Sequence, residues 1–270
     1  RDQSEQTIRT IRQHGLDVLI VVGGDGSLSI ANELAALGVR VIGVPKTIDN
    51  DLAATDVTFG FDSALAIATE AVDRLHTTAM SHQRVMVLEV MGRYAGWIAL
   101  ESGLAGGGDV ILIPEIPFDI EKVAEAIRER GYKGRSFAIV VVAEGAKPIG
   151  GELIVRRRIE ESTDPLRLGG IGNWVAAQLE ARLEMETRAT VLGHLQRGGI
   201  PTPFDRVLGT RFGVHAVRAA VAGESSVMVA LRGREIVTVP LTEAVAHLRL
   251  VDPAGELVRA SRSVGTTFGD

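Results

Sequence analysis

Short apolar runs rich in β-branched residues alternate with amphipathic stretches along most of the chain. Five such runs predict buried strands, at residues 18–22, 39–44, 85–90, 110–113 and 137–142. Because parallel strands are covered on both faces, they form nearly continuous apolar runs rather than an alternation of apolar and polar residues. The pattern therefore predicts an α/β fold with mainly parallel sheets that are covered by helices on both faces.

Helices are expected between these runs. Apolar residues between Leu65 and Leu75 are spaced for one helical face, and Asp119 is a suitable N-cap for a helix that Gly131 ends. Residues 144–170, rich in glycine and charge, are expected to form a solvated excursion. Residues 265–270 are expected to be a frayed tail.

Composition excludes several classes of protein. The 270 residues are 46% hydrophobic and 4% aromatic, which is enough for one large domain or two of modest size. A net charge of −5 gives no basic surface for nucleic acid or an anionic membrane. The chain has no cysteine, and no apolar run reaches the roughly 18 residues that a bilayer span needs. We expect a cytoplasmic protein without a nucleic-acid or membrane partner.

A glycine-rich segment follows the first predicted strand. Gly24, Asp25, Gly26 and Ser27 lead into a helix that is expected from Leu28. Glycines let the backbone approach a ligand, and the N-terminus of a helix offers free N–H groups to phosphate. Asp25 would repel phosphate unless it holds Mg²⁺. The alternative is an ordinary tight turn between strand and helix.

A second polar loop follows the second predicted strand. It contains Lys46, Thr47, Asp49 and Asp51. Two carboxylates this close destabilise each other unless a cation or a proton intervenes. One acid is expected to take a proton from an attacking hydroxyl while the other helps to hold a metal, as phosphoryl transfer requires. The alternative is a cluster of Asx turns.

Histidine and arginine residues lie beside other glycines and strand ends. His194 and Arg197 stand within Gly193–Gly199, a pattern that suits capture of a phosphate dianion. Arg84 and Arg93 lie at the two ends of the run 85–90. A lone arginine more often forms a surface ion pair, and spacing alone does not show that these residues converge.

Together these motifs resemble the ATP- and pyrophosphate-dependent 6-phosphofructokinases. The motifs occur in the family's order over roughly residues 5–240, and they are GGDGS, PKTIDND, SHQR, EVMGRYAGW, PE, AEG and TRATVLGHLQRGG. The resemblance implies two interleaved three-layer α/β domains. It also implies a first strand and a glycine-rich phosphate loop ahead of Arg1, so the chain is expected to lack the family's N-terminal segment.

The resemblance implies roles for the first two loops. Asp49 matches the general base that deprotonates the sugar 1-hydroxyl, and Thr47 lies beside the transferring phosphoryl group. Asp25 matches a magnesium-associated acid, and Asp51 matches a second acid near the metal and the substrate. Lys46 is able to assist the donor, which Gly24, Asp25, Gly26 and Ser27 are expected to bind.

Further matches concern the sugar phosphate. Arg93 would stabilise charge on the phosphoryl group, Met91 and Gly92 would line the sugar, and Glu144 would accept hydrogen bonds from its hydroxyls. A separate set of four residues would bind the 6-phosphate, namely His194, Arg197, Arg84 and Arg188. In the family, the arginines that match Arg84 and Arg188 come from a neighbouring subunit, so a homo-oligomer, dimer or tetramer, with a shared active site is expected.

Mapped onto this chain, the family's donor-binding domain takes residues 1–60 and 196–246. The sugar-phosphate domain takes residues 61–195 and 247–270. The expected reaction is transfer from ATP to fructose 6-phosphate with Mg²⁺, giving fructose 1,6-bisphosphate.

Two residues, Gly26 and Lys46, bear on whether ATP or pyrophosphate donates the phosphoryl group. Gly26 accompanies ATP use in the family, because an aspartate there would fill the space of the α-phosphate, whereas Lys46 is typical of pyrophosphate enzymes. Pyrophosphate is therefore the alternative donor, and sedoheptulose 7-phosphate is an alternative acceptor that the sequence leaves open. Two other classes remain: a catalytically silent regulatory subunit, and NAD or diacylglycerol kinases, which would lack the combined motifs.

Overall fold

The computed structural model describes residues 3–153, 155–158 and 166–270, and within them the chain forms two compact units. The first unit comprises residues 1–62 and 201–249, and the second comprises residues 63–200 and 250–270. The three boundaries between the units follow residues 62, 200 and 249, whereas the family mapping places them after residues 60, 195 and 246. Which substrate each unit binds stays a prediction.

The first unit is built on a mainly parallel sheet of order β1-β2-β10-β11, with the short β3 paired to β2. Within it, β10 and β11 pair antiparallel. Its elements are α1 (Ser4–Gln13), β1 (Leu19–Gly23), α2 (Asp25–Ala36), β2 (Val41–Thr47), β3 (Phe59–Gly60), α7 (Pro203–Val221), β10 (Val227–Arg232), β11 (Glu235–Pro240) and α8 (Leu241–Ala244).

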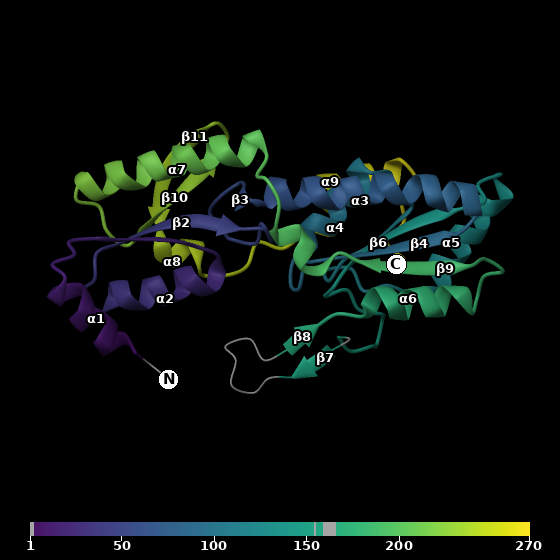
Figure 1. The fold of residues 1–270 in the computed structure, drawn as a ribbon, viewed down its shortest axis with the longest axis horizontal. Coiled ribbons are helices and arrows are strands. Elements are labelled where there is room, and N and C mark those ends of the chain that lie inside the picture. Colours follow the sequence, from purple (N-terminus) through teal and green to yellow (C-terminus); the bar gives the residue numbers. More distant parts are fainter. Residues whose placement is uncertain (1–2, 154, 159–165) are drawn as a thin grey trace. The chain divides into compact units, whose positions relative to one another are not determined.

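Helices cover both faces of this sheet, which makes three layers (Figure 1). On one face, Leu28 of α2 and Leu241 of α8 pack against Val41 and Met228. On the other face, Phe212 of α7 packs with Ile42 and Val229. Successive residues of one strand thus point into opposite cores, as expected for a strand, whose side chains alternate between its two faces.

The second unit is built on a parallel sheet of order β5-β6-β4-β9. Helix α3 (Phe61–His82) leads into it. Its other elements are β4 (Val85–Val90), α4 (Trp97–Ala105), β5 (Val110–Leu112), α5 (Ile120–Tyr132), β6 (Ala138–Ala143), β7 (Val155–Arg158), β8 (Leu166–Leu168), α6 (Ile171–Glu180), β9 (Thr187–Val191), the 3₁₀ helix η1 (Gly193–Arg197) and α9 (Glu256–Ser263).

The core of the second unit is apolar. Val123 of α5 and Val175 of α6 pack against Val87 and Val140 of the central strands, and all four side chains are fully buried. On the other face Gly103 of α4 lies so close to Ile111 that an added Cβ would stand 2.6 Å from the Ile111 Cγ1. This face is therefore packed through a residue without a side chain.

Local predictions were accurate where the local pattern is strong. The strand at 85–90 has the predicted bounds, and the other four predicted strands are present with ends shifted by up to three residues. Asp119 caps α5 as predicted, because its side chain accepts a hydrogen bond from the Glu121 N–H at 2.9 Å. The predicted helix after the first strand begins at Asp25, one turn earlier than Leu28.

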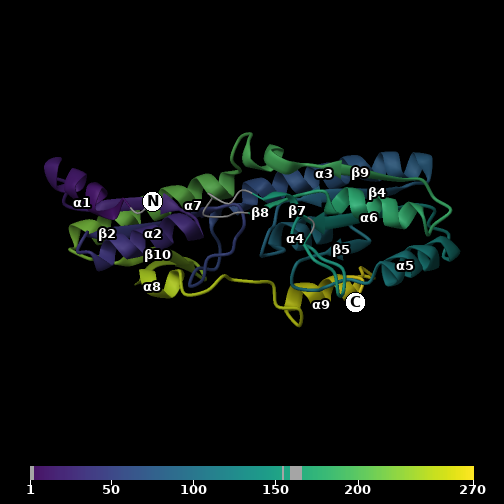
Figure 2. The same ribbon diagram turned by 90° about the horizontal axis from the view of Figure 1, so that it is seen from below.

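The prediction of a frayed C-terminus was wrong. The Ile111 N–H donates to the Thr267 oxygen at 2.9 Å, and the Asp119 N–H donates to the Gly269 oxygen at 2.7 Å. Phe268 is fully buried. Residues 265–270 thus lie along the free edge of β5, near α9 (Figure 2).

The region 144–170 is only partly described. Its residues 155–158 form β7, which pairs antiparallel with β8, while residues 154 and 159–165 lie outside the described residues. Within the part of the chain that the structure describes, no helix is both long and apolar enough to cross a bilayer.

Candidate active site

The turn between β1 and α2 has little room for side chains. An added Cβ on Gly23 would stand 2.5 Å from the Ser27 Cβ, and one on Gly24 would stand 3.1 Å from the Thr47 Cβ. Gly23 pairs with Pro45 in the parallel register of β1 and β2. The two polar loops predicted from the sequence therefore lie side by side at the carboxyl ends of adjacent strands, where α/β sheets bind ligands.

Asp25, Gly26 and Ser27 form the first turn of α2. The first hydrogen bond within the helix is donated by the Leu28 N–H to the Gly24 oxygen at 3.0 Å. No side chain caps this helix, so the N–H groups of its first turn face the loop region without an intrahelical partner. An anion is favoured at such a position by the helix dipole and by these donors.

Thr47 and Asp49 form a hydrogen-bonded pair at the end of β2. The Thr47 hydroxyl donates to the Asp49 Oδ2 at 3.3 Å and accepts from the Asp49 backbone N–H at 3.1 Å. The hydroxyl thereby holds both the backbone and the carboxylate of Asp49. Lys46, next to this pair, is exposed.

Asn50 holds the loop in shape, a role that sequence reasoning missed. Its φ is 54°, in the left-handed region that asparagine tolerates better than most residues. Its buried side-chain oxygen accepts from the Thr58 N–H at 3.1 Å, and its backbone oxygen accepts from Arg249 Nη1 at 3.3 Å. Asp49 and Asp51 are thus presented from either side of an anchored residue.

The surroundings of Asp51 disfavour the charged form of its carboxyl group. Burial raises the pKa of its carboxyl to about 6, and the negative charges of Asp49 and Asp25 act in the same direction. Its Oδ1 is buried and has no hydrogen-bond partner among the described residues. These three carboxylates therefore share one neighbourhood that would gain from a cation or a proton.

The residues present fit a magnesium ion that is completed by a ligand. Among the described residues, no three His, Cys, Asp or Glu side chains gather closely enough to hold a metal by themselves. Mg²⁺ is usually held by one or two carboxylates together with waters and substrate phosphates. The unpaired Asp51 oxygen and the neighbouring acids suit that kind of binding.

In the second unit, another group of predicted residues lies at the carboxyl ends of β4 and β6. Met91, Gly92 and Arg93 follow β4, and Glu144 follows β6. The Glu144 N–H donates to the Val90 oxygen at 2.9 Å, which keeps the two loops together.

Gly145 sets how closely the loops after β4 and β6 approach. Its N–H donates to the Gly92 oxygen at 3.0 Å. A Cβ there would stand 1.9 Å from the Arg93 oxygen, so no side chain fits. Gly145 lies within the AEG motif, from which no role was predicted for it.

Gln196 joins a third loop to this group, and sequence reasoning missed its role as well. This buried side chain accepts from the Met91 N–H at 3.3 Å and donates to the Gly193 oxygen at 3.2 Å. It fixes η1, whose His194 and Arg197 are both exposed. Within the second unit, Met91, Arg93, Glu144 and His194 therefore come from loops at the same edge of one sheet.

Arg84 and Arg188 lie elsewhere in the same unit. Arg84 precedes β4, and Arg188 stands near the start of β9. The six residues of β4 separate Arg84 from Met91, which corresponds to about 20 Å at the usual rise of a strand. The structure thus does not bring these two arginines to the group around Met91 within this chain.

Known proteins match this chain in sequence and in fold. The family model described as phosphofructokinase matches residues 1–220. An ATP-dependent 6-phosphofructokinase of Chloroflexus aurantiacus is 60% identical over 269 residues, which cover all of this chain and 74% of the relative. A pyrophosphate–fructose 6-phosphate 1-phosphotransferase of Streptomyces coelicolor is 55% identical over 94% of this chain and 73% of its own.

Among solved structures, a pyrophosphate-dependent phosphofructokinase from Marinobacter aquaeolei aligns with a TM-score of 0.79 at 28% identity, covering 93% of this chain and 65% of that one. Phosphofructokinase of Pichia pastoris aligns with a TM-score of 0.78 at 34% identity, covering 90% of this chain and 28% of that one. Sequence, fold and the order of the loops therefore agree, and the chain belongs to the phosphofructokinase family.

Proposed function

We propose that the protein transfers the terminal phosphoryl group of ATP to the 1-hydroxyl of fructose 6-phosphate. The observation that carries this proposal is the hydrogen-bonded pair of Thr47 and Asp49 beside the Gly24 turn. A carboxylate held by a hydroxyl next to the N-terminus of a helix provides a base beside a phosphate site.

In the proposed reaction, Asp49 accepts the proton of the sugar 1-hydroxyl. The oxygen O1 then forms a bond to the γ-phosphorus, and the bond from that phosphorus to the β,γ-bridging oxygen breaks, releasing ADP. Gly24, Gly26 and Ser27 bind the donor phosphates through backbone N–H groups, and Lys46 adds a positive charge. Phosphoryl transfer depends mostly on such positioning and charge neutralisation.

Mg²⁺ is the proposed cofactor. Asp25 would hold it, with Asp51 near by, and the ion would supply positive charge to the donor's phosphate oxygens. The raised pKa of Asp51 and its unpaired Oδ1 support this assignment.

The sugar phosphate is assigned to the second unit. Met91 and Gly92 would contact the sugar, Glu144 would accept hydrogen bonds from its hydroxyls, and Arg93 would stabilise the charge of the moving phosphoryl group. His194 and Arg197 are exposed and supply the donors that a 6-phosphate requires.

Arg84 and Arg188 are assigned to the sugar phosphate of a neighbouring subunit, so the active enzyme is a homo-oligomer. The length of β4, which separates Arg84 from Met91, supports this assignment.

Pyrophosphate is the second candidate donor. It is favoured by the exposed Lys46, and one of the relatives above is named for pyrophosphate at 55% identity. ATP is favoured by Gly26: apart from its chain neighbours and the backbone of its own helix, nothing lies within 4 Å of its Cβ position, which leaves room for a larger donor.

Initial rates on fructose 6-phosphate with Mg²⁺, measured with ATP and with pyrophosphate in parallel, test the proposal. We expect turnover with ATP to exceed turnover with pyrophosphate. Turnover with pyrophosphate alone would replace the donor, and no turnover with either would overturn the proposed function.

A further inference from the structure

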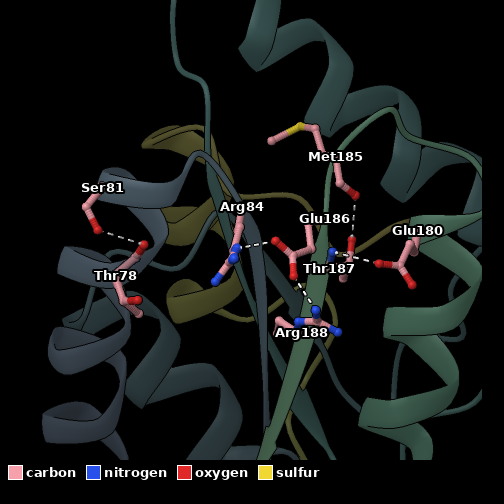
Figure 3. A network of polar contacts seen from close by, with 8 residues as sticks. All are labelled: Thr78, Ser81, Arg84, Glu180, Met185, Glu186, Thr187 and Arg188. Atoms are coloured by element: carbon pink, nitrogen blue, oxygen red, sulfur yellow. Dashed lines mark hydrogen bonds and ion pairs between the residues drawn. The ribbon is translucent and has the colours of Figure 1, made fainter.

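Three charged side chains meet at the amino ends of β4 and β9 (Figure 3). The Nε of Arg84 lies 2.5 Å from the Glu186 Oε2, and Nη2 of Arg188 forms an ion pair with the Glu186 Oε1. One carboxylate therefore binds two guanidinium groups, one through each of its oxygens.

The backbone fixes the places of Arg84 and Glu186. Gln83 ends α3 with a φ of 53°, and the Arg84 N–H then donates back to the Ala79 oxygen at 3.1 Å. This bond closes the helix in the manner of a Schellman motif. The next residue, Val85, donates to the Glu186 oxygen at 3.0 Å. Arg84 and Glu186, each directly ahead of one of two adjacent strands, are thus brought close together by the backbone alone.

The segment that carries Glu186 is held from its other side too. The Thr187 N–H donates to the Glu180 Oε1 at 3.4 Å, and the Thr187 hydroxyl donates to the Met185 oxygen at 3.3 Å (Figure 3). Thr187 also pairs with Val85 in the register of β4 and β9. The Glu186 carboxylate is therefore presented from an anchored backbone.

Taken by themselves, the three charged side chains leave an excess of one positive unit, while the nearby Glu180 carboxylate accepts from the Thr187 N–H. Two guanidinium groups face one carboxylate. Desolvation acts to raise the pKa of Glu186, but Arg188 and Arg84 together outweigh it and hold this pKa below its usual range. Without Glu186, the two arginines would repel each other and would be free to separate. With Glu186 charged, they are kept together and still attract an anion.

Glu186 contacts Arg84 through Nε and not through the terminal nitrogens of the guanidinium group. Glu186 contacts the Nε, which is buried, and among the described residues it is the only acid paired with Arg84. A guanidinium has five N–H donors, and the contact with Glu186 does not use those on the terminal nitrogens of Arg84. The Arg188 side chain is 61% exposed and retains donors as well.

We propose that Glu186 is a positioning residue that holds Arg84 and Arg188 together as a two-armed receptor for the phosphate of a sugar phosphate. This inference rests on the proposed function, in which these arginines serve the substrate of a neighbouring subunit. Glu186 itself does not touch the substrate. It acts by fixing the spacing and direction of the two arginines.

A competing role makes the opposite prediction. If Glu186 occupied the place of the phosphate, its carboxylate would have to be displaced, and removing its charge would strengthen binding of the sugar phosphate. The contact with the buried Nε of Arg84, rather than with its outer nitrogens, favours the positioning role.

The test compares Glu186→Gln with Glu184→Gln in the full-length protein. Glu184 is an exposed acid of the same segment, so the control removes the same charge without touching either arginine. For Glu186→Gln we expect the KM for fructose 6-phosphate to rise about tenfold. The KM for the donor should stay unchanged, and the control should match the parent. Glu186→Asp, which restores a carboxylate on a shorter arm, should lie between Glu186→Gln and the parent.

Calorimetric titration of the same proteins with fructose 6-phosphate gives a second reading that needs no donor, and thermal unfolding shows that each variant is folded. An unchanged or lower KM and Kd for Glu186→Gln would overturn the inference, as would an equal rise in the KM for the donor. If the parent binds the sugar phosphate but turns over with neither donor, only the proposed function is refuted. The Kd values of the variants then still test the role of Glu186. A parent that does not bind it would refute both.

Discussion

The Thr47 hydroxyl lies 3.3 Å from the Asp49 Oδ2 and 3.1 Å from the Asp49 backbone nitrogen, so one side chain sets the direction of the proposed base. The same threonine is in contact range of any side chain placed at Gly24. Thr47 thereby contacts both the proposed base, Asp49, and the loop that is proposed to bind the donor.

Replacing Thr47 by valine keeps the shape of the side chain and removes the hydroxyl. Because the Asp49 carboxylate would lose its hydrogen bond, we expect kcat to fall by about 10- to 100-fold. Thr47→Ser retains the hydroxyl and should keep most of the activity. Steady-state kinetics on fructose 6-phosphate would contradict this reading if the two variants were equally active.

Replacing Gly26 by aspartate should change the donor. Apart from its chain neighbours and the backbone of its own helix, nothing lies within 4 Å of the Cβ position of Gly26, so the variant should fold normally. Its carboxylate would repel the α-phosphate of ATP, and a cost of about 1.4 kcal/mol or more corresponds to at least a tenfold loss with ATP. Rates with ATP and with pyrophosphate measure the change. An equal loss with both donors would show that Gly26 does not select between them.

Asp51 should make the folded state less stable as the pH rises. Its folded pKa of about 6 lies above the ordinary value of 3.8, so the folded protein binds the proton more tightly than the unfolded chain does. The free energy of unfolding should therefore fall between about pH 4 and pH 6, by up to about 3 kcal/mol.

The variant Asp51→Asn removes this penalty. Denaturant unfolding in the absence of Mg²⁺ should show it to be more stable than the parent at pH 8, with the difference shrinking toward pH 4. Asp17→Asn, at an exposed aspartate of the same unit, is the control. A stability difference that stays constant across this pH range would refute the assignment of the titration to Asp51.

Asn50 contributes both its backbone conformation and its amide oxygen. Asn50→Gly keeps the left-handed φ but leaves the Thr58 N–H without its acceptor, which should cost about 1–3 kcal/mol. Asn50→Ala adds the strain of a left-handed alanine, about 1–2 kcal/mol more. Unfolding free energies check this order, and alanine at least as stable as glycine would be inconsistent with it.

Much of the fold follows from local pattern, and the exceptions have identifiable causes. Apolar β-branched runs predict the strands because these side chains are buried on both faces, as in β4. The tail was mispredicted because its order comes from distant partners, Ile111 and Asp119, which no local pattern reveals.

The candidate site was predictable in part. The loops after β1, β2, β4 and β6 stood out because each directly follows an apolar strand. Asn50, Gly145 and Gln196 lie within the quoted motifs but were given no role, since their function depends on contacts with Thr58, Arg93 and Met91. Glu186, next to a quoted motif, emerges only from the pairing of β4 with β9.

The most direct test of the account is the turnover of Asp49→Asn on fructose 6-phosphate with ATP and Mg²⁺, beside the parent. Asparagine nearly preserves the shape of the side chain but does not accept the proton of the 1-hydroxyl. The account predicts a kcat lower by about 10²- to 10⁴-fold, with the KM for fructose 6-phosphate within a few-fold of the parent. A variant that turns over as fast as the parent would show that Asp49 is not the base and would contradict the account.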